Sequence, residues 1–451
     1  MKSKVLLSGI IGWFVFVCPQ KLDAQEKRNI SLADAIDLSI KNSKQLKVSK
    51  ARIDAAVAAT KQAHQNQLPD LKISGAYLRL TQPNITMESK SNNGGGSGGG
   101  NQPTTYSIDQ AVYGIANLSL PIYSGMRIQY GIRSAEYLEK AATLDADYNK
   151  EEVMLNAINA FANLYKAKEN VMLINENLAQ SRSRDKEFAD LEKNGLLARN
   201  DMLKAALQTS NIELVLVDAE NNLRFSNVNM NLMMGLPEKT ELIPDSITLQ
   251  LPNEVKSIEE YEQLALQNRK DMQAQQVRLK ETAIGIKSAK SDYYPSLALT
   301  SGWIAADIPG FISITNAFTF GVGLQYNVSS LWKTGAKVDQ ARAREAEARA
   351  NEELLDDNIR LQINQAYENY VSAIKRIEVT DKSIIQANEN YKITKNKYDN
   401  SLVTVTDLLD ANVSMLQSWL SNELAKADAI IAYNTLLQKA GMLGSAFNTK
   451  P

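Results

Sequence analysis

The chain has 451 residues, of which 44% are hydrophobic and 22% are charged, which is enough apolar sequence for a large core. The 50 lysine and arginine residues balance 51 aspartate and glutamate residues, so the charge does not indicate a nucleic-acid partner. Cys18 is the only cysteine and His64 the only histidine. A zinc site of several cysteines and histidines and an intrachain disulfide are therefore excluded.

Residues 1–24 have the layout of a secretory signal peptide. Two lysines precede an apolar stretch from Val5 to Val17 that is too short to cross a bilayer as a helix, and Ala24 offers a cleavage site. Cys18 leaves a lipoprotein signal with an acylated cysteine as an alternative, although the valine before it is larger than such signals use. No later apolar run reaches the length of a transmembrane helix, so the protein is periplasmic, secreted or an outer-membrane β-barrel.

The rest of the chain repeats one pattern twice. Ser31 to Pro69 aligns with Ser257 to Pro295, and each segment opens with a capping box and stops at its proline. We therefore predict helices over about 31–66 and 258–292. The repeat also predicts the domain organisation: a first structural repeat over 25–236, an inter-repeat linker over 237–256, a second structural repeat over 257–441 and a C-terminal tail over 442–451.

Two strands are predicted after each of these prolines. The clearest is 318–329, where apolar or aromatic residues alternate with small or polar ones throughout. A soluble sheet would alternate in the same way, but strands of about ten residues with a small polar second face favour a membrane barrel around water. Four strands cannot close a barrel, so the pattern predicts an oligomer, and three copies would supply twelve strands. The other strands are predicted over 71–80, 112–120 and 297–305, and the Gly-rich stretch 92–101 is predicted to be a surface linker.

Long helices are predicted after the strands, because 122–236 and 310–450 contain no proline. At 1.5 Å per residue the first would be roughly 100 Å long, which exceeds the thickness of a membrane. The helices must therefore extend into an aqueous compartment, with the connecting turns at the far tip. The predicted helices are 127–193 and 200–234 in the first copy, with a turn at 194–199, and 336–399 and 406–440 in the second, with a turn at 400–405.

Local motifs repeat in the same order as these elements. A strand-to-helix signature runs from Leu118 to Gly125, with a degenerate partner from Leu331 to Gly335, and the tip turns run from Asn194 to Asp201 and from Asn400 to Asp407. Together they make the chain similar to the TolC-type outer-membrane efflux protein family over about 26–441. The resemblance implies a mainly α fold with a β-barrel portion: a trimeric twelve-stranded outer-membrane β-barrel continued by a twelve-helix periplasmic α-barrel, built from an internal duplication.

The resemblance also implies a passive exit duct of a tripartite efflux or type I secretion system, located in the outer membrane with a long periplasmic extension. The implied partners are two further copies, a periplasmic adaptor (membrane fusion protein), an inner-membrane transporter and outer-membrane lipid, with no nucleic acid. No catalytic residue, cofactor or metal is implied, in agreement with a sequence that lacks a nucleophile–base pattern and a P-loop. The main alternative is a periplasmic coiled-coil adaptor or scaffold without a pore, which leaves the alternating strands unexplained; an outer-membrane enzyme is a more distant one. The cargo and the pump family stay open.

Two aspartates are candidates for a periplasmic gate. Asp407 and Asp410 are three residues apart at the start of a helix, so both face one side. The resemblance places them at the constriction motif of the family, where a trimer would carry two rings of negative charge that attract cations. Asp407 has a purely structural alternative, because Thr404-x-x-Asp407 is also a capping box.

In the family, a tyrosine and an arginine before this motif bond to an aspartate of the first copy and hold the tip closed. Tyr398 and Asp201 fall at the tyrosine and aspartate positions, but Val403 falls at the arginine position. Either the closing network is incomplete or another group such as Arg199 replaces the missing arginine. Our hypothesis is that closure depends on Tyr398, Asp201 and packing.

Three residues at the tip are candidates for contact with the adaptor. Leu196 and Leu402 are apolar residues in polar turns, and exposed apolar patches commonly mark contacts. Gly195 is the third candidate, with the alternative that it serves only the geometry of the turn.

Overall fold

The computed structural model describes residues 27–81, 84–86, 105–107, 109–245, 256–309 and 312–447. The predicted signal peptide with Cys18 and the Gly-rich stretch lie outside these ranges. The chain forms two compact units, each containing parts of both predicted repeats. Unit 1 comprises Met1–Asn42, Ala157–Thr248 and Ser383–Ala427, and unit 2 comprises Ser43–Asn156, Leu249–Lys382 and Asp428–Pro451.

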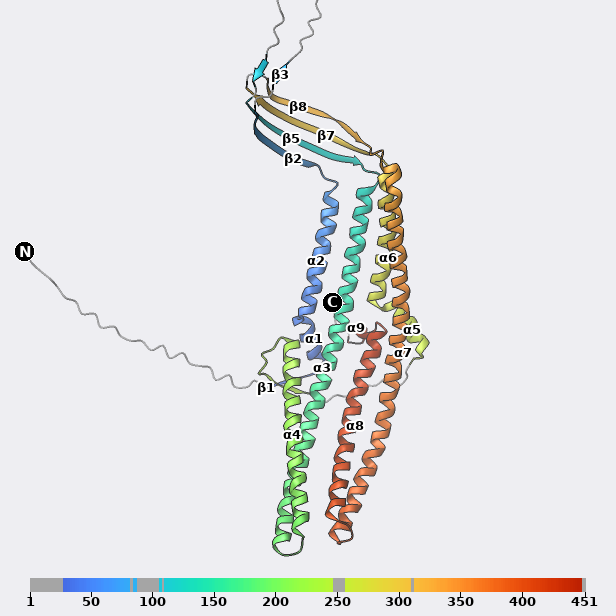
Figure 1. Cartoon of the computed structure of the whole chain (residues 1–451). Coiled ribbons are helices and arrows are strands. Elements are labelled where there is room, and N and C mark those ends of the chain that lie inside the picture. Colours follow the sequence, from blue (N-terminus) through green and yellow to red (C-terminus); the bar gives the residue numbers. More distant parts are fainter. Residues whose placement is uncertain are drawn as a thin grey trace, which may run out of the picture. The chain divides into compact units, whose positions relative to one another are not determined.

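Unit 2 contains an antiparallel four-stranded sheet with the order β2-β5-β7-β8. Figure 1 shows its strands side by side, curving together away from the helices of the same unit. The small hairpin of β3 (Asn84–Thr86) and β4 (Thr105–Ser107) extends the β2–β5 connection. All four predicted strands are present, as β2 (Asp70–Arg79), β5 (Gln110–Tyr123), β7 (Ser296–Ile308) and β8 (Ile312–Gln325).

The prediction placed the start of the last strand too late, and a bulge explains why. β8 begins at Ile312 rather than at residue 318 and ends at Gln325. The pairing slips where Ile304 faces Ala317 and Ala306 faces Ile314, and Asn316 there has a left-handed φ of 57°. Asn316 interrupts the row of apolar residues at even positions, although the strand continues. The one extra residue in β8 places Ile312 and Ile314 on the face opposite to Phe318.

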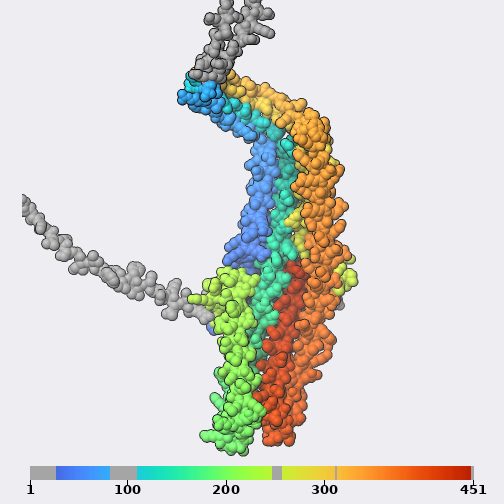
Figure 2. Space-filling view, viewed as in Figure 1, coloured from blue at the N-terminus to red at the C-terminus, as the bar shows by residue number. Residues whose placement is uncertain are grey.

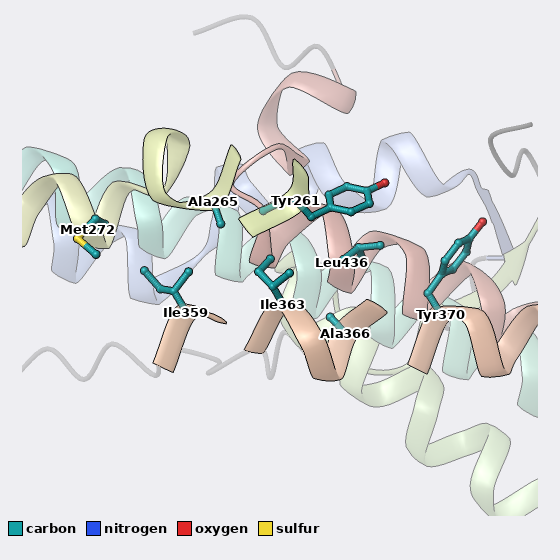
Figure 3. Packing of buried hydrophobic residues seen from close by; sticks show 9 residues of the cluster. Tyr261, Ala265, Met272, Ile359, Ile363, Ala366, Tyr370 and Leu436 are labelled. Carbon is teal, nitrogen blue, oxygen red and sulfur yellow. The ribbon is translucent and has the colours of Figure 1, made fainter. Parts of the chain in front are cut away.

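The helices of unit 2 pack around a cluster of buried apolar side chains. The cluster joins α5 (Ile258–Asn268) and α6 (Lys270–Lys290) to the first part of α7 (Ser330–Asp399) and the end of α8 (Val405–Lys439). Figure 3 shows Ile359 and Ile363 of α7 pointing toward α5 and α8, with Leu436 beside them. The unit also contains α2 (Lys44–Gln65), the first part of α3 (Arg127–Lys193), the 3-10 turn η1 (Ser291–Tyr293) and the short α9 (Leu443–Ala446).

Unit 1 contains two helical pairs and a small parallel sheet. It comprises α1 (Leu32–Asn42), the second part of α3, α4 (Arg199–Met234), the end of α7 and the start of α8. β1 (Lys27–Ile30) pairs in parallel with β6 (Glu241–Pro244), and the sequence did not predict this sheet. The green surface of α4 is exposed along its length in Figure 2. Ile30 and Leu242 of the sheet are buried together with Phe161, Leu164 and Met234.

The first helix of each predicted repeat is broken, contrary to the expectation of one continuous helix. The break in the first copy falls at Ser43, whose hydroxyl accepts a hydrogen bond from the backbone N–H of Leu46 at 3.2 Å and so caps α2. The break in the second copy falls at Arg269, which is extended with ψ 127°. Gly441, which follows α8, packs against this backbone. The helix is therefore interrupted where the end of α8 contacts it.

Arg269 fixes that break through a buried side chain. Its guanidinium, 3% exposed, donates to both carboxylate oxygens of Asp271 at 3.0 and 2.7 Å and to Gln362 at 2.9 Å. Glu151 of α3 lies near this charged group, and burial raises its pKa to about 7, with Lys270 opposing the shift and Asp271 adding to it.

Glu151→Gln should stabilise the protein at pH 8 and leave its stability unchanged at pH 4. The folded pKa of about 7 exceeds the ordinary 4.5, so the unfolded chain loses this proton first and stability falls as pH rises through that window. After discounting for solvent screening, the gain above pH 7 is on the order of 1 kcal/mol. Thermal unfolding in detergent across this pH range measures it, with exposed Glu353→Gln as the control. A pH-independent difference would contradict the assignment.

Candidate functional site

The helices of the described ranges include none that is both long enough and apolar enough to cross a membrane. Within the same ranges, no three histidine, cysteine, aspartate or glutamate side chains gather where they could hold a metal ion. Two other features stand out in the structure: the sheet of unit 2 and the turns at the ends of the helices in unit 1.

One face of the sheet is apolar and exposed. Phe318, Phe320 and Ile73 have exposed fractions of 77%, 79% and 78%. The strand register joins them into one surface, because Phe318 pairs with Trp303, Trp303 with Ala116, and Ala116 with Ile73. Side chains at paired positions lie on the same face. Further exposed apolar residues in register with these are Leu71, Tyr77, Val112, Leu118, Val322 and Leu324.

The opposite face carries small and polar residues in the half of the sheet near the start of β7, whereas Leu78, Ile115, Ile304, Ile312 and Ile314 lie on it in the other half. Asn117, Gly302 and Thr319 lie in register across three strands. A Cβ atom at Gly302 would lie 2.8 Å from the Thr319 hydroxyl and 3.2 Å from the Asn117 side-chain oxygen, so a larger residue there would displace these side chains. One face therefore suits hydrocarbon and the other suits water, as the sequence alternation predicted.

The tip turns of unit 1 have the same backbone geometry. After α3, Gly195 has φ 73° and donates its N–H to the carbonyl of Glu192, and Leu196 donates to that of Leu191 at 2.8 Å. After α7, Ser401 has φ 59°, and Leu402 donates its N–H to the carbonyl of Lys397 at 2.8 Å. Both are Schellman motifs, which usually place glycine at the left-handed residue. The chain uses serine in the second copy.

Ser401→Gly should raise the free energy of unfolding by roughly 0.5–1 kcal/mol, because glycine removes the strain of a left-handed side-chain-bearing residue. Gly195→Ser should lower it by a similar amount, since a Cβ at Gly195 would meet no atom within 4 Å and only backbone strain is added. Denaturant unfolding of both variants measures the two changes. Changes of equal sign would contradict the shared turn geometry.

The two turns are joined by a buried apolar cluster. Phe188 and Ala205 of one helical pair pack with Val405 and Leu409 of the other. Tyr398 packs at the edge of this cluster, with its ring centroid 5.9 Å from that of Phe188. Burial raises the pKa of the Tyr398 hydroxyl, and the nearby Glu187 and Asp201 carboxylates add to the shift, so the ring stays neutral.

The predicted closing pair lies in one region without a direct bond. Among the hydrogen bonds of the described tip residues, none joins the Tyr398 hydroxyl to Asp201; the Asp201 carboxylate instead accepts from Lys204 at 3.3 Å. Arg199 is exposed at the start of α4, and Val403 is half-buried.

The two gate candidates differ in their surroundings. The Asp407 carboxylate accepts from the backbone N–H of Thr404 at 2.8 Å and from its hydroxyl at 2.6 Å, which is the predicted capping box. These bonds lower the pKa of Asp407 and keep it ionised. Asp410 is exposed one turn later, on a helix whose other face, at Leu409 and Ala411, is buried.

Leu196 and Leu402 are exposed at the tip, at 74% and 72%. Each follows the left-handed residue of its turn, where the chain projects beyond the helix ends. Gly195 shares the first of these turns, so the three predicted contact residues lie on the two tip turns.

A ladder of buried polar bonds was not predicted. The Ser181 and Thr209 hydroxyls lie 2.6 Å apart between α3 and α4, and Asn412 of α8 donates to Asn177 of α3 at 3.0 Å. Arg184 donates to Ser181 at 2.9 Å, and burial lowers the pKa of its guanidinium. The available signal was the spacing of Asn177 and Ser181, four residues apart among the buried positions of α3.

The model of the family described as outer membrane efflux protein matches residues 35–236 and 262–442. The chain therefore belongs to the outer membrane efflux protein family, and its predicted roles as an outer-membrane protein and an efflux channel are confirmed. It is 21% identical to outer membrane efflux protein BepC of Brucella suis biovar 1 (strain 1330) over 404 residues, 86% of each chain.

Solved channels share the fold. The outer membrane protein VceC of Vibrio cholerae matches with a TM-score of 0.75 and 18% identity over 91% of this chain and 96% of that one. The CmeC outer membrane channel of Campylobacter jejuni matches with a TM-score of 0.76 and 16% identity over 91% and 86%. The predicted resemblance to TolC-type channels is confirmed at the level of the fold.

Proposed function

We propose that three copies of this chain form the exit duct of a tripartite efflux or type I secretion system. The observation that carries this is the open sheet: β2 and β8 each have a neighbouring strand on one side only in the described chain. Hydrocarbon does not tolerate an unpaired strand edge. Pairing β8 of one copy with β2 of the next would give a twelve-stranded barrel, with the apolar face toward lipid and the polar face around water.

The exposed face of α4 supports the same assembly. Four large apolar side chains of α4 are exposed at spacings of four, seven and eleven residues, which place them along one stripe of the helix. They are Leu203, Leu207, Leu214 and Phe225. An apolar stripe of this length favours packing against a neighbouring copy in a twelve-helix α-barrel. We also propose an internal duplication, because two copies of one helical hairpin would supply the four helices of each subunit. The two repeats are 25–236 and 257–441, with the linker 237–256 between them and the tail 442–451 after them.

The tip would then be the docking and gating end. We assign adaptor contact to Gly195, Leu196 and Leu402, where the leucines are exposed, and expect the inner-membrane transporter to supply the energy and choose the cargo. We assign the gate to Asp407 and Asp410, supported by Tyr398 and Asp201 beside the buried cluster of the tip. The proposed duct is passive and is not an enzyme.

Asp410→Asn should reduce the preference of the channel for cations, because it removes one ring of negative charge at the narrow end. Reversal potentials of single channels under a salt gradient measure this preference. Asp54→Asn, an exposed change of equal charge on α2, is the control. Loss of cation selectivity in both variants would attribute the effect to net charge and reject the gate. If the unsubstituted protein forms no channel in a bilayer, the duct itself is rejected.

A further inference from the structure

We propose that a cavity beside the start of α7 binds the phosphate group of a membrane phospholipid. The cavity has a volume of about 320 Å³ and is lined by Lys290, Tyr293, Tyr294, Gly335, Val338, Asp339 and Arg342. This volume falls in the range of ligand pockets. The inference rests on the proposed function, in which the sheet lies in the outer membrane.

The cavity lies directly beyond the ends of two membrane strands. Tyr294 is separated from β7 by a single proline, and Ser296, the first residue of β7, pairs with Gln325, the last of β8. At 1.5 Å per residue, Val338 is about 12 Å along α7 from Ser330. Figure 1 shows α6 and α7 reaching the sheet at this end. The headgroup region of a bilayer lies just outside the hydrocarbon and is about 5–8 Å thick on each side, so the end of the cavity at Tyr294, nearest the sheet, lies at this level.

The charges around the cavity favour an anion. Arg342 pairs with Asp339 at 3.2 Å, but a guanidinium has five N–H donors, so this pair leaves donors for a ligand. Lys290 adds a second cation, so the lining carries two positive charges and one negative. The neighbouring Lys337 is already paired with Asp292, at 2.5 Å.

The aromatic wall suits the membrane interface. Tyr293 and Tyr294 are exposed beside the cavity, and rings of this kind favour the headgroup level of a bilayer. The backbone of Gly125 packs closely against Tyr294. A Cβ at Gly125, where φ is 62°, would lie only 2.9 Å from the Cβ of Tyr294. Val338, 6% exposed, gives the cavity an apolar floor. Because the floor is apolar, we expect the cavity to favour the phosphate of a lipid over a free phosphate ion.

Native mass spectrometry of the detergent-purified full chain, titrated with phosphatidylglycerol, tests the proposal. Lys290→Gln combined with Arg342→Gln should weaken retention of this lipid at least about tenfold, because charge-assisted bonds to phosphate are lost. The matched control combines Lys287→Gln with Arg344→Gln, exposed cations of the same two helices outside the cavity. Gly335→Leu should also weaken retention while leaving every charge, since a Cβ there meets no atom within 4 Å and the side chain would fill the cavity.

Two further ligands separate the sources of phosphate. Diacylglycerol, which has the chains without the phosphate, should not be retained, and inorganic phosphate should not displace the lipid at matched concentration. Equal losses in the cavity and control variants, or displacement by inorganic phosphate alone, would overturn the lipid site. Conductance of the same preparation keeps the two proposals apart: a conducting channel that retains no lipid rejects only the cavity, whereas a non-conducting protein rejects the duct.

Discussion

Gly441→Ala should destabilise the protein by about 3 kcal/mol, because it combines backbone strain with a clash that cannot relax. Gly441 follows α8 with φ 69°, which costs a non-glycine residue about 1–2 kcal/mol. A Cβ there would lie 2.9 Å from the backbone nitrogen of Arg269 and 3.0 Å from the carbonyl carbon of Asn268. Both neighbours are main-chain atoms at the break between α5 and α6.

Two other glycines provide a graded comparison in the same unfolding experiment. Gly195 has φ 73° but open space around it, so Gly195→Ala should cost only about 1 kcal/mol. Gly235 has φ 70°, and its Cβ would lie 2.9 Å from the side chain of Asn42, so Gly235→Ala should fall between them. Equal losses at all three positions would show that the contact with Arg269 contributes nothing.

Phe320→Arg should prevent stable insertion of the protein into the outer membrane. Phe320 lies on the exposed apolar face near the middle of β8. An arginine facing lipid near the bilayer midplane costs about 2–4 kcal/mol, and a trimer would carry three of them. The measurement is the yield of heat-stable oligomer in the detergent-extracted outer-membrane fraction.

Gly321→Arg is the matched control for this prediction. It introduces the same side chain at the next residue, which faces the opposite side of the strand, and a Cβ there meets no atom within 4 Å. We expect normal insertion and altered conductance. If Gly321→Arg blocks insertion while Phe320→Arg is tolerated, the two faces of the sheet are assigned the wrong way round.

The sequence predicted most of the fold because its long elements have strong local boundaries. The first long helix was predicted over 127–193 and is observed as Arg127–Lys193, since no proline interrupts it and a glycine turn follows. The breaks at Ser43 and Arg269 were missed because neither carries a proline or glycine. The turn at Arg269 depends on Gly441, more than 150 residues away along the chain, and no local pattern reports that contact.

The same distinction holds for the functional surfaces. Exposure of Leu196 and Leu402 followed from apolar residues in a polar turn, and the apolar face of the sheet followed from alternation in β8. The parallel pair of β1 and β6 was missed because two four-residue strands, far apart in sequence, carry too little periodicity. Asp407 fits both a cap and a gate in sequence, and the structure shows its bonds to Thr404.

Disulfide cross-linking between strand edges tests the trimeric duct most directly. Cys18 is the only cysteine, so a Cys18→Ala background carries no other thiol. Cysteine pairs would combine one position of β2 (Lys72, Ser74 or Ala76) with one of β8 (Thr319, Gly321 or Gly323), on the polar face. On oxidation in isolated outer membranes, we expect bands of two and three linked copies and none larger. Monomers with every pair, or a ladder extending past three copies, would contradict it.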